Sequence, residues 1–173
     1  MELEKDLRAA GFTCTRCGEC CSGKDNEVMV SPDEIDVLCK VAKLTQKEIV
    51  EPYPEWIHDQ GATYTFGYVL KRGKDGNCMF LKNKRCTVYE YRPHICRTYP
   101  FMLDGEKLLV FECPGCRLGE DTPEAEKLQK DLLARRAAED KEFLLTKEQY
   151  QKYSMVSGST IIFDSRGAHL YKQ

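Results

Sequence analysis

Residues 14–21 read Cys-Thr-Arg-Cys-Gly-Glu-Cys-Cys, so four of eight consecutive residues are cysteines. Two residues between cysteines allow a tight loop to turn two sulfurs toward one ion, while backbone amides of the turn point at the thiolates. Free cysteines are often buried as small apolar groups. Four core cysteines among threonine, arginine, glycine and glutamate would be unusual, however. The stretch therefore predicts a metal site.

The spacing within this stretch also bears on the kind of metal. Cys14, Cys17 and Cys20 resemble the loop of bacterial ferredoxins, in which one segment supplies three ligands of a [4Fe–4S] cluster. Gly18 would allow a positive φ and close approach of the backbone to sulfur. Adjacent side chains diverge in extended chain, so we expect Cys21 to point away from Cys20. Cys21 would then serve a second metal centre or a bridging position.

The remaining cysteines supply further candidates. The chain has 10 cysteines in 173 residues, roughly 6% and several times ordinary usage. Cys39 lies on the apolar face of a predicted helix, so we expect it in the core. Cys116 forms a Cys-x-x-Cys pair with Cys113 and is left open as a ligand, a redox partner or a bystander. Eight cysteines are predicted metal ligands, enough for two four-thiolate centres: Cys14, Cys17, Cys20, Cys21, Cys78, Cys86, Cys96 and Cys113.

Three later segments extend the pattern: Gly76-Asn-Cys78, Cys86 to Arg97 and Cys113-Pro-Gly. With the first stretch, they make residues 12–116 resemble the CxxCxxCC cysteine-cluster family of the YkgJ type, described as zinc- or iron-chelating. The eight usual cysteines of that family correspond to the eight candidates, with Cys39 and Cys116 as extras. The cysteine pattern is also similar to that of the flagellin lysine methylase, which is associated with an iron–sulfur cluster and S-adenosylmethionine.

Both zinc and iron–sulfur clusters are held by four thiolates. Zinc ribbons and knuckles generally present two Cys-x-x-Cys turns per site. Here one dense segment offers four sulfurs and the others come singly from afar, so we favour one or two [4Fe–4S] clusters over zinc. Arg92 and Arg97 flank Cys96 and are predicted cofactor-binding residues, either offsetting the charge of a thiolate-bound metal or holding a substrate carboxylate. Three histidines are alternative ligands, although a surface or core role is favoured for each: His58, His94 and His169.

Composition and charge exclude several classes. Lysine and arginine number 26 against 28 aspartates and glutamates, a net charge of −2, and a protein held on nucleic acid by phosphate contacts would need a basic surplus. Apolar runs approaching 18 residues are absent, so no membrane span is predicted. The charged N-terminus precedes no apolar segment of the secretory type, and we expect a cytoplasmic protein with reduced thiols. Glycine-rich nucleotide loops are also absent.

The pattern of elements predicts an α+β fold. A cysteine-rich core with short strands and hairpins is expected over residues 1–118, followed by a metal-free helix and hairpin over 119–173, leaving open that both form one compact unit. Helices are expected over 1–11, from Ser31 and from Thr45, and from Thr122 to about residue 144, continuing over 146–153. Strands are expected over 28–30 and 62–70. Hairpins are expected around Asp104-Gly105 and over 160–171.

The leading hypothesis is a soluble iron–sulfur protein that transfers electrons or assists modification of a partner protein. The resemblance implies an alternative, an S-adenosylmethionine-dependent protein lysine methylase. A structural zinc module whose long helix docks a partner is the third hypothesis, and a metal chaperone the fourth. The sequence leaves open whether the protein is an enzyme. It also leaves open the substrate, the number of metal centres and the grouping of the cysteines into sites.

Overall fold

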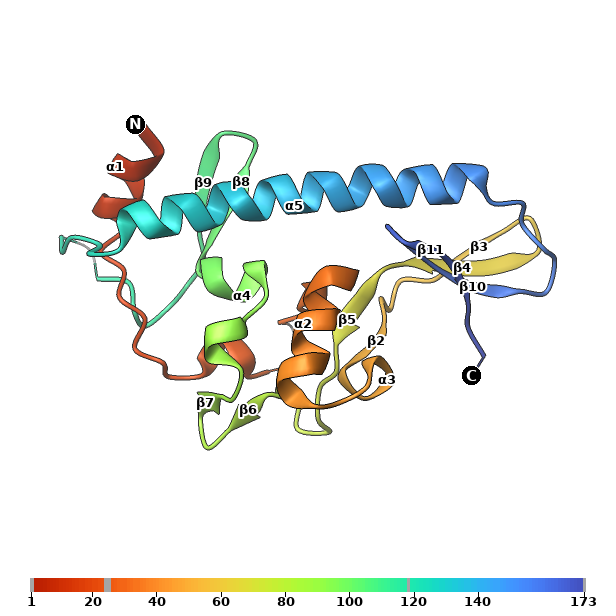
Figure 1. The fold of residues 1–173 in the computed structure, drawn as a ribbon. Coiled ribbons are helices and arrows are strands. Elements are labelled where there is room, and N and C mark those ends of the chain that lie inside the picture. Colours follow the sequence, from red (N-terminus) through yellow and green to blue (C-terminus); the bar gives the residue numbers. More distant parts are fainter. Residues whose placement is uncertain (1, 24–25, 118, 173) are drawn as a thin grey trace.

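The computed structural model describes residues 2–23, 26–117 and 119–172. It has the predicted α+β class, with most of the short helices and strands along one side of a single long helix and the β8–β9 hairpin crossing it (Figure 1). The helices are α1 (Glu2–Ala9), η1 (Glu19–Cys21), α2 (Pro32–Ala42), α3 (Gln46–Ile49), η2 (Tyr89–Tyr91), α4 (His94–Thr98) and α5 (Ala125–Lys152). The strands are β1 (Met29–Val30), β2 (Val50–Pro52), β3 (Ile57–Asp59), β4 (Ala62–Phe66), β5 (Tyr68–Leu70), β6 (Leu81–Lys82), β7 (Arg85–Cys86), β8 (Phe101–Asp104), β9 (Lys107–Val110), β10 (Thr160–Asp164) and β11 (Gly167–Leu170).

The strands form two small sheets and two separate hairpins. One sheet has the order β1–β5–β2, and the other has the order β3–β4–β10–β11. In the second sheet β10 runs parallel to β4, with Ile161 opposite Tyr64, and antiparallel to β11. The pairs β6–β7 and β8–β9 are the hairpins, and the second confirms the turn predicted at Asp104-Gly105.

The strand predicted over residues 62–70 is two strands in different sheets. The extended segment is interrupted at Gly67, so that β4 joins the four-stranded sheet and β5 joins the three-stranded one. The amide of Gly67 donates to the carbonyl of Phe163 at 2.8 Å. Alternation of residue types continues through the glycine, which is why the sequence alone predicts one strand.

Two helix starts follow the predicted capping pattern. The hydroxyl of Ser31 accepts from the amide of Glu34, whose carboxylate accepts from the amide of Ser31. The same reciprocal box joins Thr45 and Glu48 at the start of α3. That helix has only four residues, because the chain enters β2 at Val50. Capping chemistry therefore predicts where these helices begin and not how long they run.

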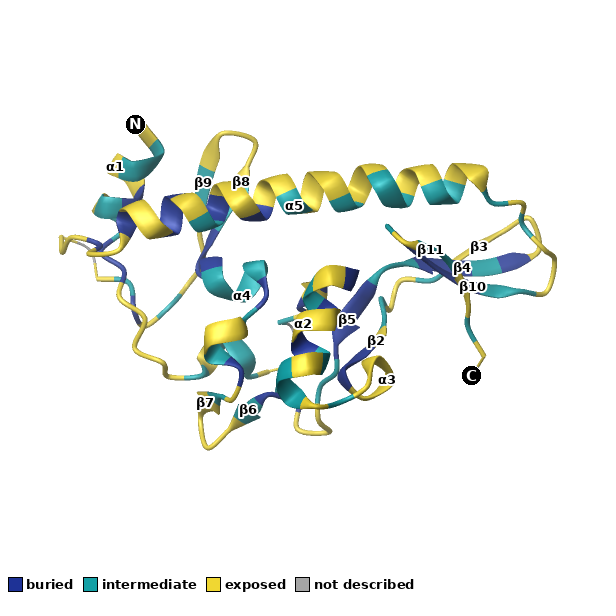
Figure 2. Cartoon of the chain, viewed as in Figure 1, coloured by how far each residue is buried: buried dark blue, intermediate teal, exposed yellow. Residues whose placement is uncertain are grey.

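Three groups of buried side chains form the core (Figure 2). The largest joins α2 to the β1–β5–β2 sheet, with Leu38 and Ile49 almost fully buried. The second lies where α1 and the first turns of α5 meet the β8–β9 hairpin, around Leu7 and Phe101. The third is aromatic and centres on Phe163.

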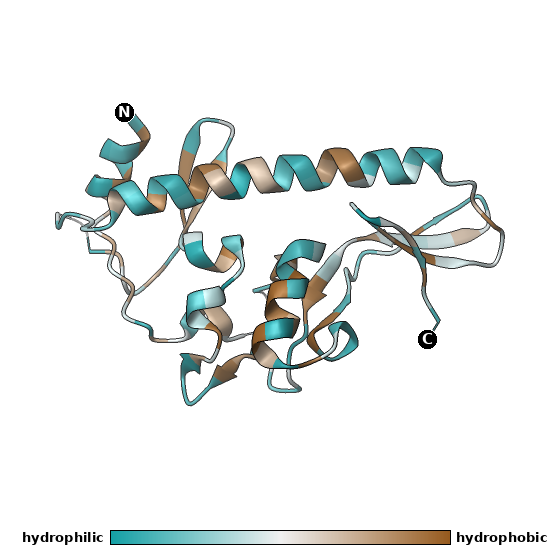
Figure 3. Ribbon diagram, in the orientation of Figure 1, coloured by the Kyte–Doolittle hydropathy of each residue, from teal (hydrophilic) through white to brown (hydrophobic). Residues whose placement is uncertain are grey.

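Helix α5 is one continuous helix of 28 residues, and it joins the helix predicted from Thr122 to about residue 144 with the predicted continuation over 146–153. Figure 3 shows hydrophilic and hydrophobic turns alternating along it. Ala125, Leu128 and Leu132 are buried against the core, whereas Leu133 is 45% exposed although it is equally apolar. The helix contacts α1, α4 and β8 through its first half and β10 and β11 through its second. Among the described helices, none is long and apolar enough to cross a membrane.

Candidate metal centre

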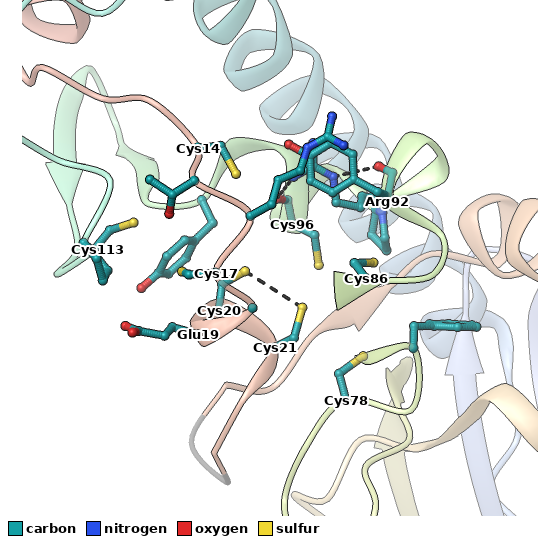
Figure 4. Close-up of a pocket in the computed structure, with 18 of the residues that line it drawn as sticks. Cys14, Cys17, Glu19, Cys20, Cys21, Cys78, Cys86, Arg92, Cys96 and Cys113 are labelled. Carbon is teal, nitrogen blue, oxygen red and sulfur yellow. Dashed lines mark hydrogen bonds between the residues drawn. The ribbon is translucent and has the colours of Figure 1, made fainter. Parts of the chain in front are cut away.

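A cavity of about 420 Å³ lies between the first cysteine loop and the segments that carry the later cysteines. Its lining includes all eight predicted ligands, and it excludes Cys39 and Cys116 (Figure 4). All ten cysteines are free thiols. In the described ranges, no three cysteine, histidine or acidic side chains are gathered closely enough to hold one ion as they stand. The eight thiols thus face a shared space, and their assignment as ligands stays a prediction.

The first loop is positioned by its contact with the β6–β7 hairpin. Gly18 has φ 82°, and a Cβ atom there would come within 2.7 Å of the Lys84 carbonyl oxygen. Only glycine permits this approach, which brings the loop against the hairpin that carries Cys86. The one-turn helix η1 follows and places Cys20 and Cys21 beside the same cavity.

The other thiols arrive on separate elements. The amide of Cys78 donates to the carbonyl of Cys21 at 2.8 Å, which ties the two cysteine segments together through the backbone. Cys86 ends strand β7, opposite Leu81. Cys96 lies in the middle of α4, and Cys113 follows β9. Residues distant in sequence are therefore brought together by turns and short hairpins.

Five of these thiols form the inner end of the cavity: Cys20, Cys21, Cys78, Cys86 and Cys96. We call them the inner thiols. The sulfurs of Cys20 and Cys21 lie 3.9 Å apart. The contact between these two thiols lowers the pKa of Cys20 and raises the pKa of Cys21, and the neighbouring Cys21 thiol also lowers the pKa of Cys86. Burial, reinforced by the neighbouring thiols, raises the pKa of Cys96.

The approach of Cys20 and Cys21 corrects the expectation that adjacent thiols diverge. That expectation holds for extended chain. Residues 19–21 instead form a 3₁₀ turn, in which the Cys21 amide donates to the carbonyl of Gly18 at 3.0 Å. Both side chains consequently reach one cavity.

Three thiols form the outer end: Cys14, Cys17 and Cys113. Cys14 and Cys17 are exposed, whereas Cys113 is half-buried. Burial raises the pKa of Cys113, and the nearby Cys116, Cys17 and Cys14 thiols raise it further. Figure 4 shows Cys14 and Cys113 on the side away from Cys78, with Cys20 between the two ends.

Positive charge reaches the cavity through Arg92. Its guanidinium carbon lies 3.6 Å from the centre of the Tyr89 ring, and its Nε donates to the Tyr89 carbonyl at 2.8 Å. The Cys21 thiol has the largest effect on the pKa of Cys20 and of Cys86, and the Arg92 charge lowers the pKa of both thiols further. Arg16 stacks on the same ring at 4.1 Å. Arg16 is not among the residues predicted from the sequence, although its position between Cys14 and Cys17 could have indicated that it lies beside the cavity.

Other candidates lie away from this cavity. Arg97, like Arg92, is predicted from the sequence to bind a cofactor. It does not line the cavity, and its guanidinium instead contacts the ring of His94 at 2.8 Å. Its Nε is buried and finds no partner among the described residues. The three histidines also lie outside the lining. His58 contacts the Thr63 hydroxyl, and His169 contacts the Asp164 carboxylate, each at 2.9 Å.

The donor set suits a thiophilic metal, because soft thiolates select zinc, copper(I) or iron–sulfur clusters, and the nearby Arg92 offsets negative charge. The fold and site thus define a cysteine-rich metal-binding protein. The sequence model of the CxxCxxCC family, described as "Putative zinc- or iron-chelating domain", matches residues 13–117, and the chain belongs to this family. Metal binding is accordingly the function of this domain.

A relative with a similar sequence is the uncharacterized protein MJ0661 of Methanocaldococcus jannaschii. It is 25% identical over 167 residues, covering 86% of this chain and 85% of the relative. The similarity thus extends beyond the matched domain into the region of α5. A search of the solved structures found no match.

Proposed function

We propose that the protein binds a [4Fe–4S] cluster at the inner end of the cavity and uses it to transfer electrons or to assist modification of a partner protein. The observation that carries this proposal is the gathering of eight thiols around one cavity, five of them at its inner end. A single zinc ion takes four thiolates. The cavity therefore has donors for more than one centre, or for a group larger than one ion.

Four of the five inner thiols would hold the cluster, since a [4Fe–4S] cluster takes four cysteines. These four would be Cys78, Cys86 and Cys96 together with either Cys20 or Cys21. When bound, such a cluster supplies one-electron redox chemistry. Arg92 would offset the negative charge of the thiolates, because its guanidinium is fixed beside the cavity by Tyr89. The inner thiols are half-buried or buried, which limits access of water to the group they hold.

A protein partner is supported by the surface of α5. Phe143 and Leu144 on this helix are 65% and 63% exposed. Phe143 borders a second cavity of about 530 Å³, which Met29 and Phe66 also line. Exposed apolar side chains that border a cavity are typical of surfaces that contact another protein. We expect the partner to contact this part of α5.

Metal and sulfide analysis tests the proposed function. Protein isolated without oxygen should contain iron and acid-labile sulfide in equal amounts and absorb visible light. Cys78→Ser, Cys86→Ser and Cys96→Ser should each lose most of the iron, and Cys39→Ser, which changes a cysteine outside the cavity, should retain it. Protein that contains zinc but neither iron nor sulfide would overturn the proposal.

The methylase alternative rests on the resemblance to the flagellin lysine methylase. Equilibrium dialysis of the iron-loaded protein against S-adenosylmethionine tests it directly, and absence of binding would reject it. Loss of iron from the Cys78 variant together with retained S-adenosylmethionine binding would separate the cofactor site from the cluster.

A further inference from the structure

Cys116 lies next to the outer thiols, although it is outside the cavity lining and is not one of the eight predicted ligands. It ends the turn Cys113-Pro-Gly-Cys116, in which the amide of Cys116 donates to the carbonyl of Cys113 at 3.0 Å. The other two outer thiols belong to Cys14-Thr-Arg-Cys17. Two Cys-x-x-Cys turns therefore meet at the outer end of the cavity, and Cys116 lies just outside its lining.

The two turns are joined directly through their backbones. Phe12 and Cys116 form an antiparallel bridge, and the amide of Thr13 donates to the carbonyl of Gly115 at 3.0 Å. A Cβ atom at residue 115 would lie 2.5 Å from the Thr13 carbonyl oxygen, so only glycine allows this contact. The pairing fixes one Cys-x-x-Cys turn against the start of the other.

The second turn already has a feature of a metal-binding turn. The amide of Gly115 points at the sulfur of Cys113, with a nitrogen-to-sulfur distance of 3.4 Å. Backbone amides directed at sulfur stabilise the thiolate form that metals require. The first turn has Gly18 in the left-handed region directly after Cys17, where the chain can curve around a bound ion.

We propose that Cys14, Cys17, Cys113 and Cys116 form a second, separate site that binds one zinc ion. Two Cys-x-x-Cys turns are the usual ligand set of a structural four-thiolate zinc site. The Cys116 side chain would rotate toward Cys113 to complete the set. The proposal adds Cys116 to the predicted ligands and leaves the inner end, where four of the five inner thiols would hold the cluster, free of zinc.

Separate measurement of zinc and iron in variants tests the proposal. The probes are zinc bound after anaerobic isolation and zinc re-added to the chelated protein. Cys116→Ser should bind zinc at least about tenfold more weakly, because losing even a hydrogen-bond partner of a metal ligand costs about 10–100-fold in affinity, and it should retain its iron. Cys78→Ser should lose most of its iron and keep its zinc affinity, and Cys39→Ser should keep both metals. Cys116→His should recover part of the zinc, because histidine is also a zinc ligand.

Three results would overturn the proposal. Unchanged zinc affinity in Cys116→Ser would remove Cys116 from the site. Loss of zinc in Cys20→Ser, with Cys116→Ser unaffected, would make Cys20 the fourth ligand. A Cys113–Cys116 disulfide in protein isolated without oxygen would assign the pair to redox chemistry. Because iron and zinc are measured separately, a protein that binds zinc at the outer site and no iron would reject the proposed cluster and keep this inference.

Discussion

The region around the cysteine cavity and the four-stranded sheet are built in different ways. Around the cavity the backbone runs in turns, one-turn helices and two-residue strands, and much of it is exposed (Figure 2). In the sheet, Thr65, Ile161 and Phe163 are completely buried. Apolar burial can order the sheet, whereas the cavity region is held by contacts between turns, and we expect a bound metal to stabilise it further. The comparison indicates that the two regions should respond to different perturbations.

Metal removal should produce the largest difference between the regions. Binding free energies of structural zinc sites are about 10–16 kcal/mol in zinc-finger peptides, and much of this is folding free energy. After chelation we expect residues 12–21 and 111–117 to lose protection from amide hydrogen exchange, while β4, β10 and β11 keep theirs. Mass spectrometry of peptides would measure this. Equal loss of protection in both regions would mean that the molecule orders as one unit.

Phe163→Ala should affect the sheet and spare the cavity. The Phe163 ring is fully buried and lies between 5.4 and 5.9 Å from the rings of Tyr64, Phe66, Tyr150 and Tyr153. Its removal should lower the free energy of unfolding by about 3–5 kcal/mol, measured by urea denaturation.

The matched control is Phe143→Ala, because this ring is largely exposed. A change within about 0.5 kcal/mol is expected there. Metal content of the folded Phe163 variant should equal that of the wild type. A variant that folds yet loses metal would show that the sheet supports the cavity directly.

Thr122→Val should affect the cavity region by weakening the attachment of the first cysteine loop to the segment before α5. The buried Thr122 hydroxyl accepts from the amide of Phe12 at 2.8 Å and donates to the carbonyl of Leu7 at 2.6 Å. Valine leaves the Phe12 amide buried without its partner, at a cost of about 1–3 kcal/mol, whereas the Leu7 carbonyl still accepts from the amide of Ala10 at 3.3 Å. Because Phe12 begins the first cysteine loop, we also expect lower zinc affinity, measured by chelator competition. Thr146→Val on α5 is the control, and equal zinc affinity in the two variants would contradict this prediction.

Arg166→Ala should have the smallest effect. Arg166 lies between β10 and β11 and contacts Asp33 and Asp36 of α2, each at 2.7 Å. All three side chains are substantially exposed, and such pairs contribute less than about 1 kcal/mol. The loss should shrink as salt concentration rises. A double-mutant cycle with Asp33→Asn measures the coupling, and a salt-independent loss would indicate packing rather than charge.

Sequence patterns predicted the elements better than the contacts between them. The capping box at Ser31 and the hairpin at Asp104-Gly105 depend on neighbouring residues, so they could be predicted from the sequence. The approach of Cys20 to Cys21 depends on a turn, and the break at Gly67 depends on pairing with strands elsewhere. The pairing of Phe12 with Cys116 joins residues about a hundred positions apart, and no local pattern predicts it.

The parallel pairing of β10 with β4 has a consequence for the order of assembly. β4 cannot acquire this neighbour until residues 160–164 have been synthesised, whereas the last cysteine is residue 116. Chains begin to fold from their N-terminal part during synthesis. Every thiol is thus present on the growing chain before the sheet closes, and a metal donor can reach the cysteine segments while α5 and β10 are still being made.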